Sequence, residues 1–538
     1  MTPPDLLAAQ PVETATVARP KIGFVSLGCP KNLVDSEVMM GLLHHNGAEL
    51  TPDAEDAEIL VVNTCSFIDS AKQESVNTIL EMARHKIAAG GKARRLIVAG
   101  CLVERYRDEI QKNIPEVDAV VGTGELEAIL AAAGLTPSGH ANNSPFNILP
   151  QGAASPTQDL ISRAPSAVHQ HSHPTEVGAQ ILAETVAEAT TSRPEGDARE
   201  QSGRFSRAAW DGATAALPEY LYSDQTPRIL TTPRASAYIK IAEGCDHPCS
   251  FCIIPQLRGK FRSRRMSSIV AEAENLIAQG VREITLIGQD TTCYGEDLGL
   301  KDGLAQLLDA LALLPGLRWL RFLYTYPNKV TTRLLETMAK HDTIAKYLDV
   351  PLQHASPAVL KRMKRGGNAQ IFLDLIAKAR QIVPNIVIRT SFIVGFPGET
   401  DADFKELEAF ITAAKIDWLG VFTYSDEEGA AAFNLDAELK LPKRTIESRR
   451  RKLMKLQQKI STRAKSAWIG REIDLLVEGP SEETELLWQG RTPLHAPEID
   501  GKVLINDFGP HDALVPGTFY RAEITESHDY DVVARILD

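Results

Sequence analysis

The sequence of 538 residues lacks several features that would each assign it to a different class of protein. It has no run of about 18 apolar residues, so no membrane-spanning helix is expected. The first residues show neither the basic start nor the apolar core of a secretory signal peptide. Cysteine is scarce, and seven of them, an odd number, do not build a disulfide scaffold. We therefore expect a cytoplasmic protein whose cysteines bind metal or take part in catalysis.

An excess of positive charge is also missing. Lys and Arg total 58 against 70 Asp and Glu, and the net charge of −12 excludes a generally basic nucleic-acid coat. The charge is unevenly distributed near the end of the chain. Residues 440–468 hold eleven bases and one acid, whereas residues 469–538 hold five bases and fifteen acids. A strongly basic segment therefore precedes a strongly acidic one.

Hydrophobic patterning divides the first half of the chain into three segments. Residues 1–20 are expected to form a flexible tail. Residues 21–136 alternate short apolar runs with amphipathic stretches, which predicts an α/β domain with a doubly wound parallel sheet. Residues 137–233 are rich in Ala, Ser, Pro, Thr and Gly and contain no Lys, so we interpret them as a low-complexity disordered insert.

The second half of the chain also divides into three segments. Residues 234–439 contain six strand-like runs, which are too few for a complete eight-stranded barrel and predict a partial (β/α)6 barrel. Residues 440–468 predict a basic linker helix. Residues 469–538 read as short alternating strands with Gly and Pro turns, which predicts a small antiparallel β-barrel.

Three cysteines form a C-x3-C-x2-C motif directly after the first of the six strand-like runs. They are Cys245, Cys249 and Cys252. Three thiolates on one tight loop suit a cubic 4Fe-4S cluster, and with no fourth Cys nearby one iron stays open to a small molecule. A zinc site is the alternative, because His247 lies inside the loop and could serve as the fourth ligand.

The run EGCDHPCSFCIIPQLRGKFRSR around these cysteines closely resembles the signature of radical S-adenosylmethionine (SAM) enzymes of the methylthiotransferase group. The resemblance implies that the open iron binds the amino and carboxylate groups of SAM, and that electron transfer then yields a 5′-deoxyadenosyl radical. It makes residues 234–439 a radical SAM domain. IVGFPGET, residues 393–400, resembles the glycine-rich strand end that lies against SAM in this superfamily, although Gly-Phe-Pro-Gly is also an ordinary turn.

Three further cysteines each end an apolar strand, in FVSLGC, LVVNTC and LIVAGC. They are Cys29, Cys65 and Cys101. Because the carboxyl ends of parallel strands share one edge of a sheet, we expect these thiols to converge there. The alternative is three small buried residues at strand ends. SLGCPKNLVDSE, NTCSFIDSAKQES and VAGCL resemble the family's N-terminal methylthiotransferase domain, which implies a second 4Fe-4S cluster on these three cysteines. Cys293 is interpreted as a bystander.

Polar and glycine residues at the predicted strand ends are further site candidates, because active groups gather there in barrels. Gln289, Asp290 and Gln353 are predicted to be catalytic, and Arg389, Gly395 and Gly398 to bind the cofactor. The alternative for the polar residues is structural, since such side chains also cap helices and fill barrel layers.

The amino-acid residues of the first motifs distinguish two branches of the family. GCPKNLVDSE and FIDSAKQES resemble the RimO type, which modifies an aspartate of the small-subunit ribosomal protein numbered twelve. The branch that modifies adenosine in transfer RNA typically has Gln-Met-Asn after the first Cys. The resemblance implies that one SAM methylates sulfur held at the second cluster, and that a second SAM yields the radical that takes hydrogen from the aspartate β-carbon. A transfer-RNA methylthiotransferase and a non-catalytic, zinc-bound scaffold on the ribosome are the alternatives.

The predicted partners follow from this resemblance and from charge. We expect a ribosomal protein substrate, an electron donor and a sulfur donor, and a monomeric enzyme. The acidic residues 469–538, a TRAM-like barrel, would repel phosphates and attract a basic protein. The basic helix at residues 440–468 either contacts ribosomal RNA or packs beside the acidic barrel.

Overall fold

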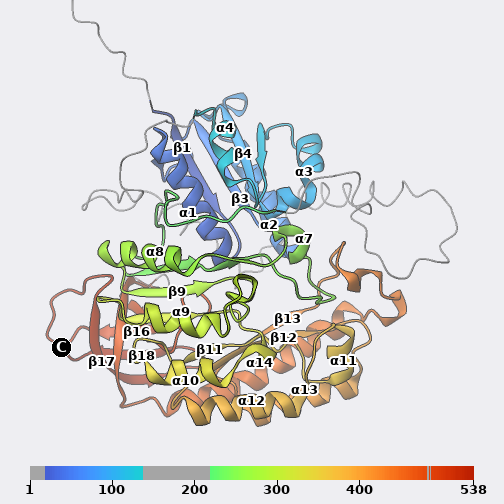
Figure 1. The fold of residues 1–538 in the computed structure, drawn as a ribbon, viewed down its shortest axis with the longest axis vertical. Helices are drawn as coiled ribbons and strands as arrows, with labels where there is room; N and C mark the ends of the chain where they lie inside the picture. The colour runs from blue at the N-terminus through green and yellow to red at the C-terminus, as the bar shows by residue number, and fades with distance from the viewer. Residues whose placement is uncertain (1–18, 137–217, 482–483, 485) are drawn as a thin grey trace, which may run out of the picture.

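The computed structural model describes residues 19–136, 218–481, 484 and 486–538. These residues form three folded units (Figure 1): an N-terminal sheet, a larger barrel below it, and a small C-terminal barrel beside the larger one. The predicted tail, apart from its last two residues, and residues 137–217 of the predicted insert lie outside the described residues. Among the described residues, no helix combines the length and apolar character needed to cross a membrane.

The N-terminal unit is a doubly wound parallel sheet, as predicted. Its strands run in the order β2-β1-β3-β4-β5. Helices α1 and α4 pack on one face, and α2 and α3 on the other, because alternate strand residues are apolar on both sides. The elements are β1 Lys21–Ser26, α1 Pro30–His45, β2 Glu49–Thr51, β3 Ile59–Thr64, α2 Asp69–Ala83, β4 Arg95–Gly100, α3 Cys101–Asn113, β5 Ala119–Val121 and α4 Ile129–Ala133, with 3-10 turns at Ile87–Ala89 and Leu126–Ala128.

The middle unit is the predicted partial barrel. Its six parallel strands form two three-stranded sheets, β6-β9-β10 and β11-β12-β13, which a bridge between Leu320 and Ile344 joins. The strands are β6 Ser236–Lys240, β9 Glu283–Ile287, β10 Trp319–Phe322, β11 Tyr347–Asp349, β12 Val387–Val394 and β13 Trp418–Thr423. Helices cover the outside: α8 Met266–Ala278, α9 Gly303–Leu311, α10 Thr332–Lys340, α11 Pro357–Arg362, α12 Ala369–Ile382 and α13 Asp401–Ala414.

Short elements surround the first cysteine motif. The two-residue strands β7 Ala242–Glu243 and β8 Arg262–Ser263 pair antiparallel, and the short helix α7 Ile254–Arg258 lies between them in the chain. Four 3-10 turns complete this unit, at Glu296–Leu298, Pro327–Lys329, Ala431–Asn434 and Ala437–Leu439. In Figure 1, α7 lies at the base of the N-terminal unit, where that unit meets the barrel.

The C-terminal unit begins with a long helix, α14 Lys443–Ser466, and closes into a barrel in the order β14-β15-β16-β18-β17. The strands are β14 Glu472–Pro480, β15 Trp488–Arg491, β16 Val503–Asp507, β17 Phe519–Ser527 and β18 Val532–Ile536. Four of the five pairings are antiparallel. The predicted small β-barrel is confirmed, with one parallel seam between β16 and β18, where β17 carries the chain across.

The C-terminal boundary predicted for the insert, residue 233, was wrong. Residues 218–233 pack into the protein, and the guanidinium of Arg228 is buried between Glu37 on α1 and Glu272 on α8, at 2.5 and 2.6 Å. The Tyr222 hydroxyl also bonds Glu272. Amino-acid composition averaged over a segment does not distinguish polar residues that are buried in ion pairs from polar residues that are exposed to solvent. The prediction of disorder therefore extended too far. This segment ties the N-terminal unit to the barrel.

Candidate functional site

The cysteines at the ends of β1, β3 and β4 face one another. Cys29 is the N-cap of α1, Cys65 directly follows β3, and Cys101 begins α3. Gly28 allows the first loop to approach the second: a Cβ at this position would lie 2.8 Å from the Cβ of Cys65 and 3.1 Å from its Sγ. The three strands are neighbours in the sheet, so residues 36 positions apart in sequence meet at one edge. We call Cys29, Cys65 and Cys101 the strand-end trio.

The strand-end trio has the chemistry of a metal site. All three thiols are free of disulfides. Burial raises the pKa of Cys101 to about 11, and burial together with the charges of Cys101 and Cys29 raises the pKa of Cys65 well above its usual range. Thiolates that are buried together repel one another unless a cation neutralises them. This donor set therefore fits an iron–sulfur cluster.

The other three cysteines lie on one loop between β7 and α7. We call Cys245, Cys249 and Cys252 the loop trio. Burial raises the pKa of Cys245 to about 11 and that of Cys252 to about 12, and neighbouring thiolates of the trio add to both shifts. The Nη1 of Arg365 donates to the Sγ of Cys249 at 3.5 Å. This donor set also fits a cluster, because three soft anionic sulfurs converge beside a cation.

His247, the candidate fourth zinc ligand, has other contacts. Its Nε2 lies 2.6 Å from Oδ2 of Asp290, and its ring stacks on Tyr326 with centroids 3.9 Å apart. The Sγ of Cys293 also donates to that carboxylate, at 3.1 Å. His247, Asp290 and Cys293 are the one group of His, Cys and acidic side chains within the described ranges whose ligand atoms all lie within 4.8 Å of one another. The Nε2 of His247 is thus directed to Asp290 rather than to the loop trio.

Helix α7 connects the two trios. It begins two residues after Cys252, and Ile253 and Leu257 pack against Cys101. At its end, Arg258 donates through Nη2 to the Sγ of Cys101 at 3.6 Å. A five-residue helix is about 7.5 Å long. The loop trio therefore lies at one end of α7, and a cysteine of the strand-end trio is packed along its side and bonded to its last residue.

A buried charge cluster surrounds the end of α7. The Nη1 of Arg258 lies 2.9 Å from Asp35 on α1 and 3.1 Å from Glu243 on β7. Lys240 bonds the same two carboxylates. Burial alone would lower the pKa of Arg258, but Glu243 and the other nearby anions raise it well above the usual value. Paired charges of both signs thus join the N-terminal unit to the barrel at this point.

The structure places the predicted residues Gln289 and Asp290 beside this cluster and the loop trio. The Gln289 amide donates to Glu243 at 2.7 Å, and its Oε1 is buried with no hydrogen-bond partner among the described residues. Burial would raise the pKa of Asp290, but hydrogen bonds from His247, Thr292 and Cys293 lower it below the usual value. Asp290 is therefore kept as a carboxylate, and Gln289 offers an acceptor without a partner.

The remaining predicted site residues have contacts within the protein. Gln353 has a φ of 71° and bonds β12 through its backbone, to Ser391 and Ile393. Arg389 pairs with Asp349 at 2.7 Å and lies 3.7 Å from Asp500.

The two predicted glycines lie against side chains. A Cβ at Gly395 would lie 2.5 Å from Ile446 of α14, and one at Gly398 would lie 3.2 Å from Arg362. The missing side chain at Gly395 thus serves the packing of α14. The cofactor roles of Arg389, Gly395 and Gly398 stay predictions.

Sequence reasoning missed three basic residues at the site: Lys31, Arg258 and Arg365. The Nζ of Lys31 lies 3.0 Å from the ring centroid of Tyr324, and burial lowers the pKa of Lys31 to about 8. Lys31 and Arg258 lie within the quoted cysteine motifs, so the available signal for them was a basic residue in an otherwise buried segment, whereas Arg365 lies outside those motifs.

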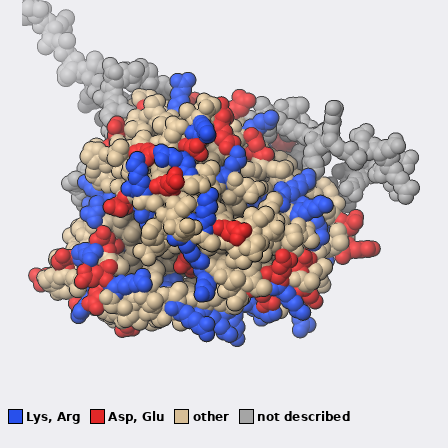
Figure 2. Space-filling view, turned by 60° about the horizontal axis from the view of Figure 1, so that its bottom comes forward, with Lys and Arg blue, Asp and Glu red and all other residues tan. Residues whose placement is uncertain are grey.

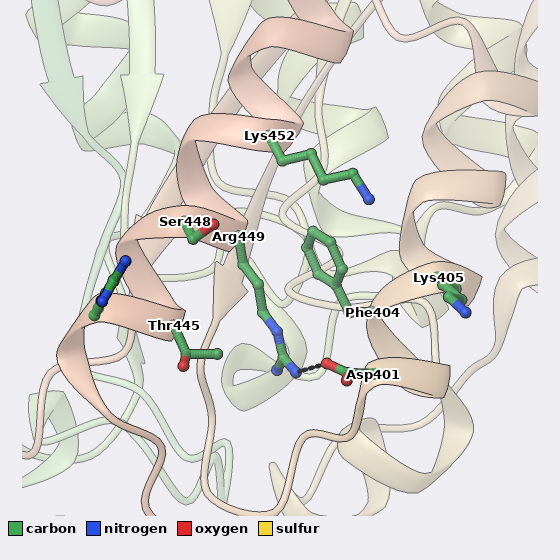
Figure 3. A pocket seen from close by; sticks show the side chains of 8 residues that line it. Asp401, Phe404, Lys405, Thr445, Ser448, Arg449 and Lys452 are labelled. Atoms are coloured by element: carbon green, nitrogen blue, oxygen red, sulfur yellow. Dashed lines mark hydrogen bonds and ion pairs between the residues drawn. The ribbon is translucent and has the colours of Figure 1, made fainter.

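A separate cavity of about 440 Å³ lies between α13 and α14 (Figure 3). Arg449 points from α14 to Asp401 at the start of α13, at 2.7 Å, and Phe404 lies between the helices. Its lining is mainly basic and polar: Asp401, Phe404, Lys405, Arg444, Thr445, Ser448, Arg449 and Lys452. No cysteine belongs to this lining, so the cavity is distinct from the two trios.

Three family models match the chain in succession. The uncharacterized protein family UPF0004 matches residues 21–122, the radical SAM superfamily matches residues 239–411, and the TRAM domain matches residues 469–537. The strand-end trio lies in the first match and the loop trio in the second.

The chain is similar along almost its whole length to proteins named ribosomal protein uS12 methylthiotransferase RimO. The relative from Koribacter versatilis (strain Ellin345) is 65% identical over 517 residues, which cover 96% of each chain. The relative from Solibacter usitatus (strain Ellin6076) is 52% identical over 96% of this chain and 95% of its own. A solved structure of the radical SAM methyltransferase TsrM from Kitasatospora setae has a TM-score of 0.46 at 14% identity, over 76% of this chain and 72% of its own.

Proposed function

The chain belongs to the RimO family of radical SAM methylthiotransferases, and from this premise we propose that it adds a methylthio group to the β-carbon of an aspartate in ribosomal protein uS12. The structural observation that carries the proposal is the pair of cysteine trios that α7 connects: the loop trio directly precedes this helix, and Cys101 of the strand-end trio packs against it. A single trio suffices for a SAM cluster. A second buried trio beside it supplies the thiolates for the sulfur-transferring centre that methylthio transfer needs.

The proposed cofactors are SAM and two 4Fe-4S clusters. Cys245, Cys249 and Cys252 would hold the cluster that binds SAM, and Cys29, Cys65 and Cys101 the second. When bound, these groups supply the radical chemistry that is required because the aspartate β-carbon is not acidic enough for a side-chain base. The number of clusters and the assignment of the cysteines are part of this proposal.

The chain's own residues would position and shield the reactants. The trios are buried or half-buried, which limits access of water to both. Asp290 holds His247 against Tyr326 and so fixes the loop trio. The buried Oε1 of Gln289 would accept a hydrogen bond from the bound substrate or cofactor. The left-handed conformation of Gln353 and its two backbone hydrogen bonds to β12 would fix the segment that follows β11.

We further infer a basic protein partner for the C-terminal barrel. Its sequence carries fifteen acids and five bases, so ion pairs within the barrel, such as those of Arg521 with Glu472 and of Arg535 with Glu523, still leave ten acids in excess. Opposite charge favours encounter with a basic ribosomal protein. An electron donor and a sulfur donor are also required. We also propose that the enzyme is a monomer and acts in the cytoplasm.

Helix α14 supports a second contact of the same complex, with ribosomal RNA. One side of the helix packs: Arg449 pairs with Glu399, and Gln458 bonds Asp529 of the barrel at 2.5 Å. The opposite side is exposed, and there Lys455, Lys459 and Arg463 have no carboxylate partner within the described ranges. Figure 2 shows Lys and Arg side chains gathered toward the lower edge of the face it presents. Bases four apart on one helix face form a row that suits a phosphate backbone.

The decisive experiment is a comparison of two substrates. The anaerobically reconstituted enzyme is incubated with SAM, sulfide and a reductant, together with either ribosomal protein uS12 or transfer RNA, and each substrate is analysed by mass spectrometry. We expect one methylthio group on one aspartate of uS12 and none on the RNA. Modified RNA with unmodified uS12 would contradict the proposal, and a colourless protein that leaves SAM intact would favour the zinc-bound scaffold.

The RNA contact is tested separately with assembled small subunits. Replacing Lys455, Lys459 and Arg463 by Gln should weaken binding and reduce its dependence on salt, because fewer counterions are released. Substitution of Lys405, Arg444 and Lys452, at the cavity between α13 and α14, is the matched control for charge. Equal effects of both sets would contradict a contact specific to the exposed row.

A further inference from the structure

We propose that Arg258 and Arg365 are a matched pair of positioning residues: each donates a hydrogen bond to one thiolate of one cysteine trio and so sets the reduction potential of the cluster held there. The inference rests on the proposed two-cluster function. It assigns a role to the buried Arg258 and the half-buried Arg365, which the mechanism above does not use. It also predicts that the two potentials are set independently.

Arg258 serves the strand-end trio. Its Nη2 lies 3.6 Å from the Sγ of Cys101 and 3.4 Å from Oδ1 of Asn32, while Nη1 is held by Asp35 and Glu243. The side chain is 2% exposed. The guanidinium is thus fixed by two carboxylates on one side and presents its other nitrogen to the sulfur. Its positive charge is offset by those carboxylates.

Arg365 serves the loop trio and is held in a different way. Its Nη2 donates to the backbone oxygen of Pro351 at 2.8 Å, and its guanidinium lies 4.4 Å from the ring centroid of Tyr326. The Nη1 is left to donate to the Sγ of Cys249 at 3.5 Å. Among the described residues no carboxylate pairs with Arg365. Its positive charge is therefore not offset as that of Arg258 is.

Hydrogen bonds to ligating sulfurs raise the reduction potential of an iron–sulfur cluster, because reduction adds negative charge that the donor stabilises. A nearby positive charge acts in the same direction, and more strongly in a buried site. Arg258 pairs with two carboxylates and Arg365 with none among the described residues, so the two arginines should affect their cluster potentials differently. At Arg365 charge and hydrogen bond both contribute, whereas at Arg258 the hydrogen bond is the main contribution.

The test uses two full-length proteins that each keep one trio. The variant C29A/C65A/C101A retains the loop trio, and the variant C245A/C249A/C252A retains the strand-end trio. Each is combined with Lys or Met at Arg258 and at Arg365, reconstituted anaerobically, and titrated electrochemically while the reduced cluster is followed by electron paramagnetic resonance. Arg264 is the control, since it is as buried as Arg258 but pairs with Glu272 and has no hydrogen bond to sulfur.

We expect each substitution to lower the potential of its own cluster only. R365M should shift the reduced-to-oxidised ratio at fixed potential by about tenfold or more in the loop-trio protein, equal to 59 mV for one electron, and R365K by less. R258M and R258K should both shift the strand-end cluster, by similar amounts, because Lys keeps the charge but cannot span both carboxylates and the sulfur. R264K should shift neither.

Several outcomes would overturn the inference. Unchanged potentials in R258K and R365K, or equal shifts in both one-trio proteins, would show that the arginines have a structural role only. Loss of all iron from R258K in the strand-end protein would have the same meaning. If the unsubstituted strand-end protein binds no cluster, both the inference and the two-cluster proposal fail. If the potentials respond as expected but uS12 is not modified, the proposed substrate fails and the inference stands.

Discussion

The two cysteine trios reach similar chemistry by opposite routes. The loop trio occupies eight consecutive residues, so its geometry is set by one loop and the short helix that follows. The strand-end trio is spread over 73 residues and depends on three strands pairing in register. The comparison teaches that the first site should tolerate damage to the N-terminal sheet, whereas the second cannot exist without it.

Removing each trio separately should give the largest effect. C245A/C249A/C252A is expected to abolish both SAM cleavage and methylthio transfer, whereas C29A/C65A/C101A should abolish transfer and keep SAM cleavage. Two cubic clusters hold about eight irons, and each variant should hold about four. Iron and sulfide analysis and product detection by chromatography check this. A wild-type protein with about four irons would remove the basis of the comparison.

Removing Arg228 should loosen the assembly that carries the strand-end trio. R228M leaves the buried carboxylate of Glu37 without its ion-pair partner and leaves Glu272 with Arg264 alone, which costs about 3–5 kcal/mol of unfolding free energy. Denaturant unfolding measures the loss. The double variant R228M/E37Q should recover part of it, and an unchanged midpoint in R228M would contradict the role of this ion pair.

Two glycine substitutions compare the trios directly. G28A places a Cβ against Cys65 at a φ of +93°, and G244A places one 2.1 Å from the backbone oxygen of Lys260 at a φ of +77°. Each should cost about 1–3 kcal/mol. G28A is expected to lower iron only at the strand-end trio, and G244A only at the loop trio, as read from spectra of the two one-trio proteins. Equal losses at both trios in either variant would mean that they are not independent.

The smallest expected effect is a change of unfolding free energy with pH at Lys465. This residue belongs to neither trio, so the effect serves as a reference for the variants above. Burial lowers the pKa of Lys465 to about 8, and its Nζ lies 3.6 Å from the ring centroid of Trp418. The unfolded chain holds this proton up to a higher pH, so stability should rise with pH above about 8. Relative to K465M, the wild type should gain about 1 kcal/mol between pH 7 and 8.5. Unfolding midpoints at these pH values check it, and a fall with pH would contradict the sign.

Sequence patterns predicted those parts of the molecule that depend on local periodicity. Apolar runs followed by amphipathic stretches predicted the parallel sheet and the partial barrel. The rule that parallel strand ends share an edge predicted that Cys29, Cys65 and Cys101 lie together. The C-x3-C-x2-C spacing alone was enough to predict that the loop trio forms one site. In both cases the information lies within one strand–loop–helix unit or in a general rule of sheet topology.

Features that depend on contacts between units could not be predicted in this way. Arg258 follows the loop trio in sequence yet bonds Cys101, and Gly395 is small because Ile446 packs against it. Residues 218–233 have the composition of a linker, but Arg228 and Tyr222 are buried by partners on α1 and α8. The partners of these residues are distant in the sequence, so local sequence patterns do not reveal the contacts and only the folded structure does.

The buried ion pairs of Arg228 and Arg258 have a consequence for how the chain can be divided. Both arginines lie after residue 217, and their carboxylate partners Glu37 and Asp35 lie before residue 137. These pairs and the apolar cluster shared by α1 and the barrel strands hold the two parts without the peptide bonds between them. Two polypeptides, one ending at 136 and one beginning at 218, should therefore associate when produced together. The enzyme would then behave as a heterodimer whose subunit interface runs between the strand-end trio and the loop trio.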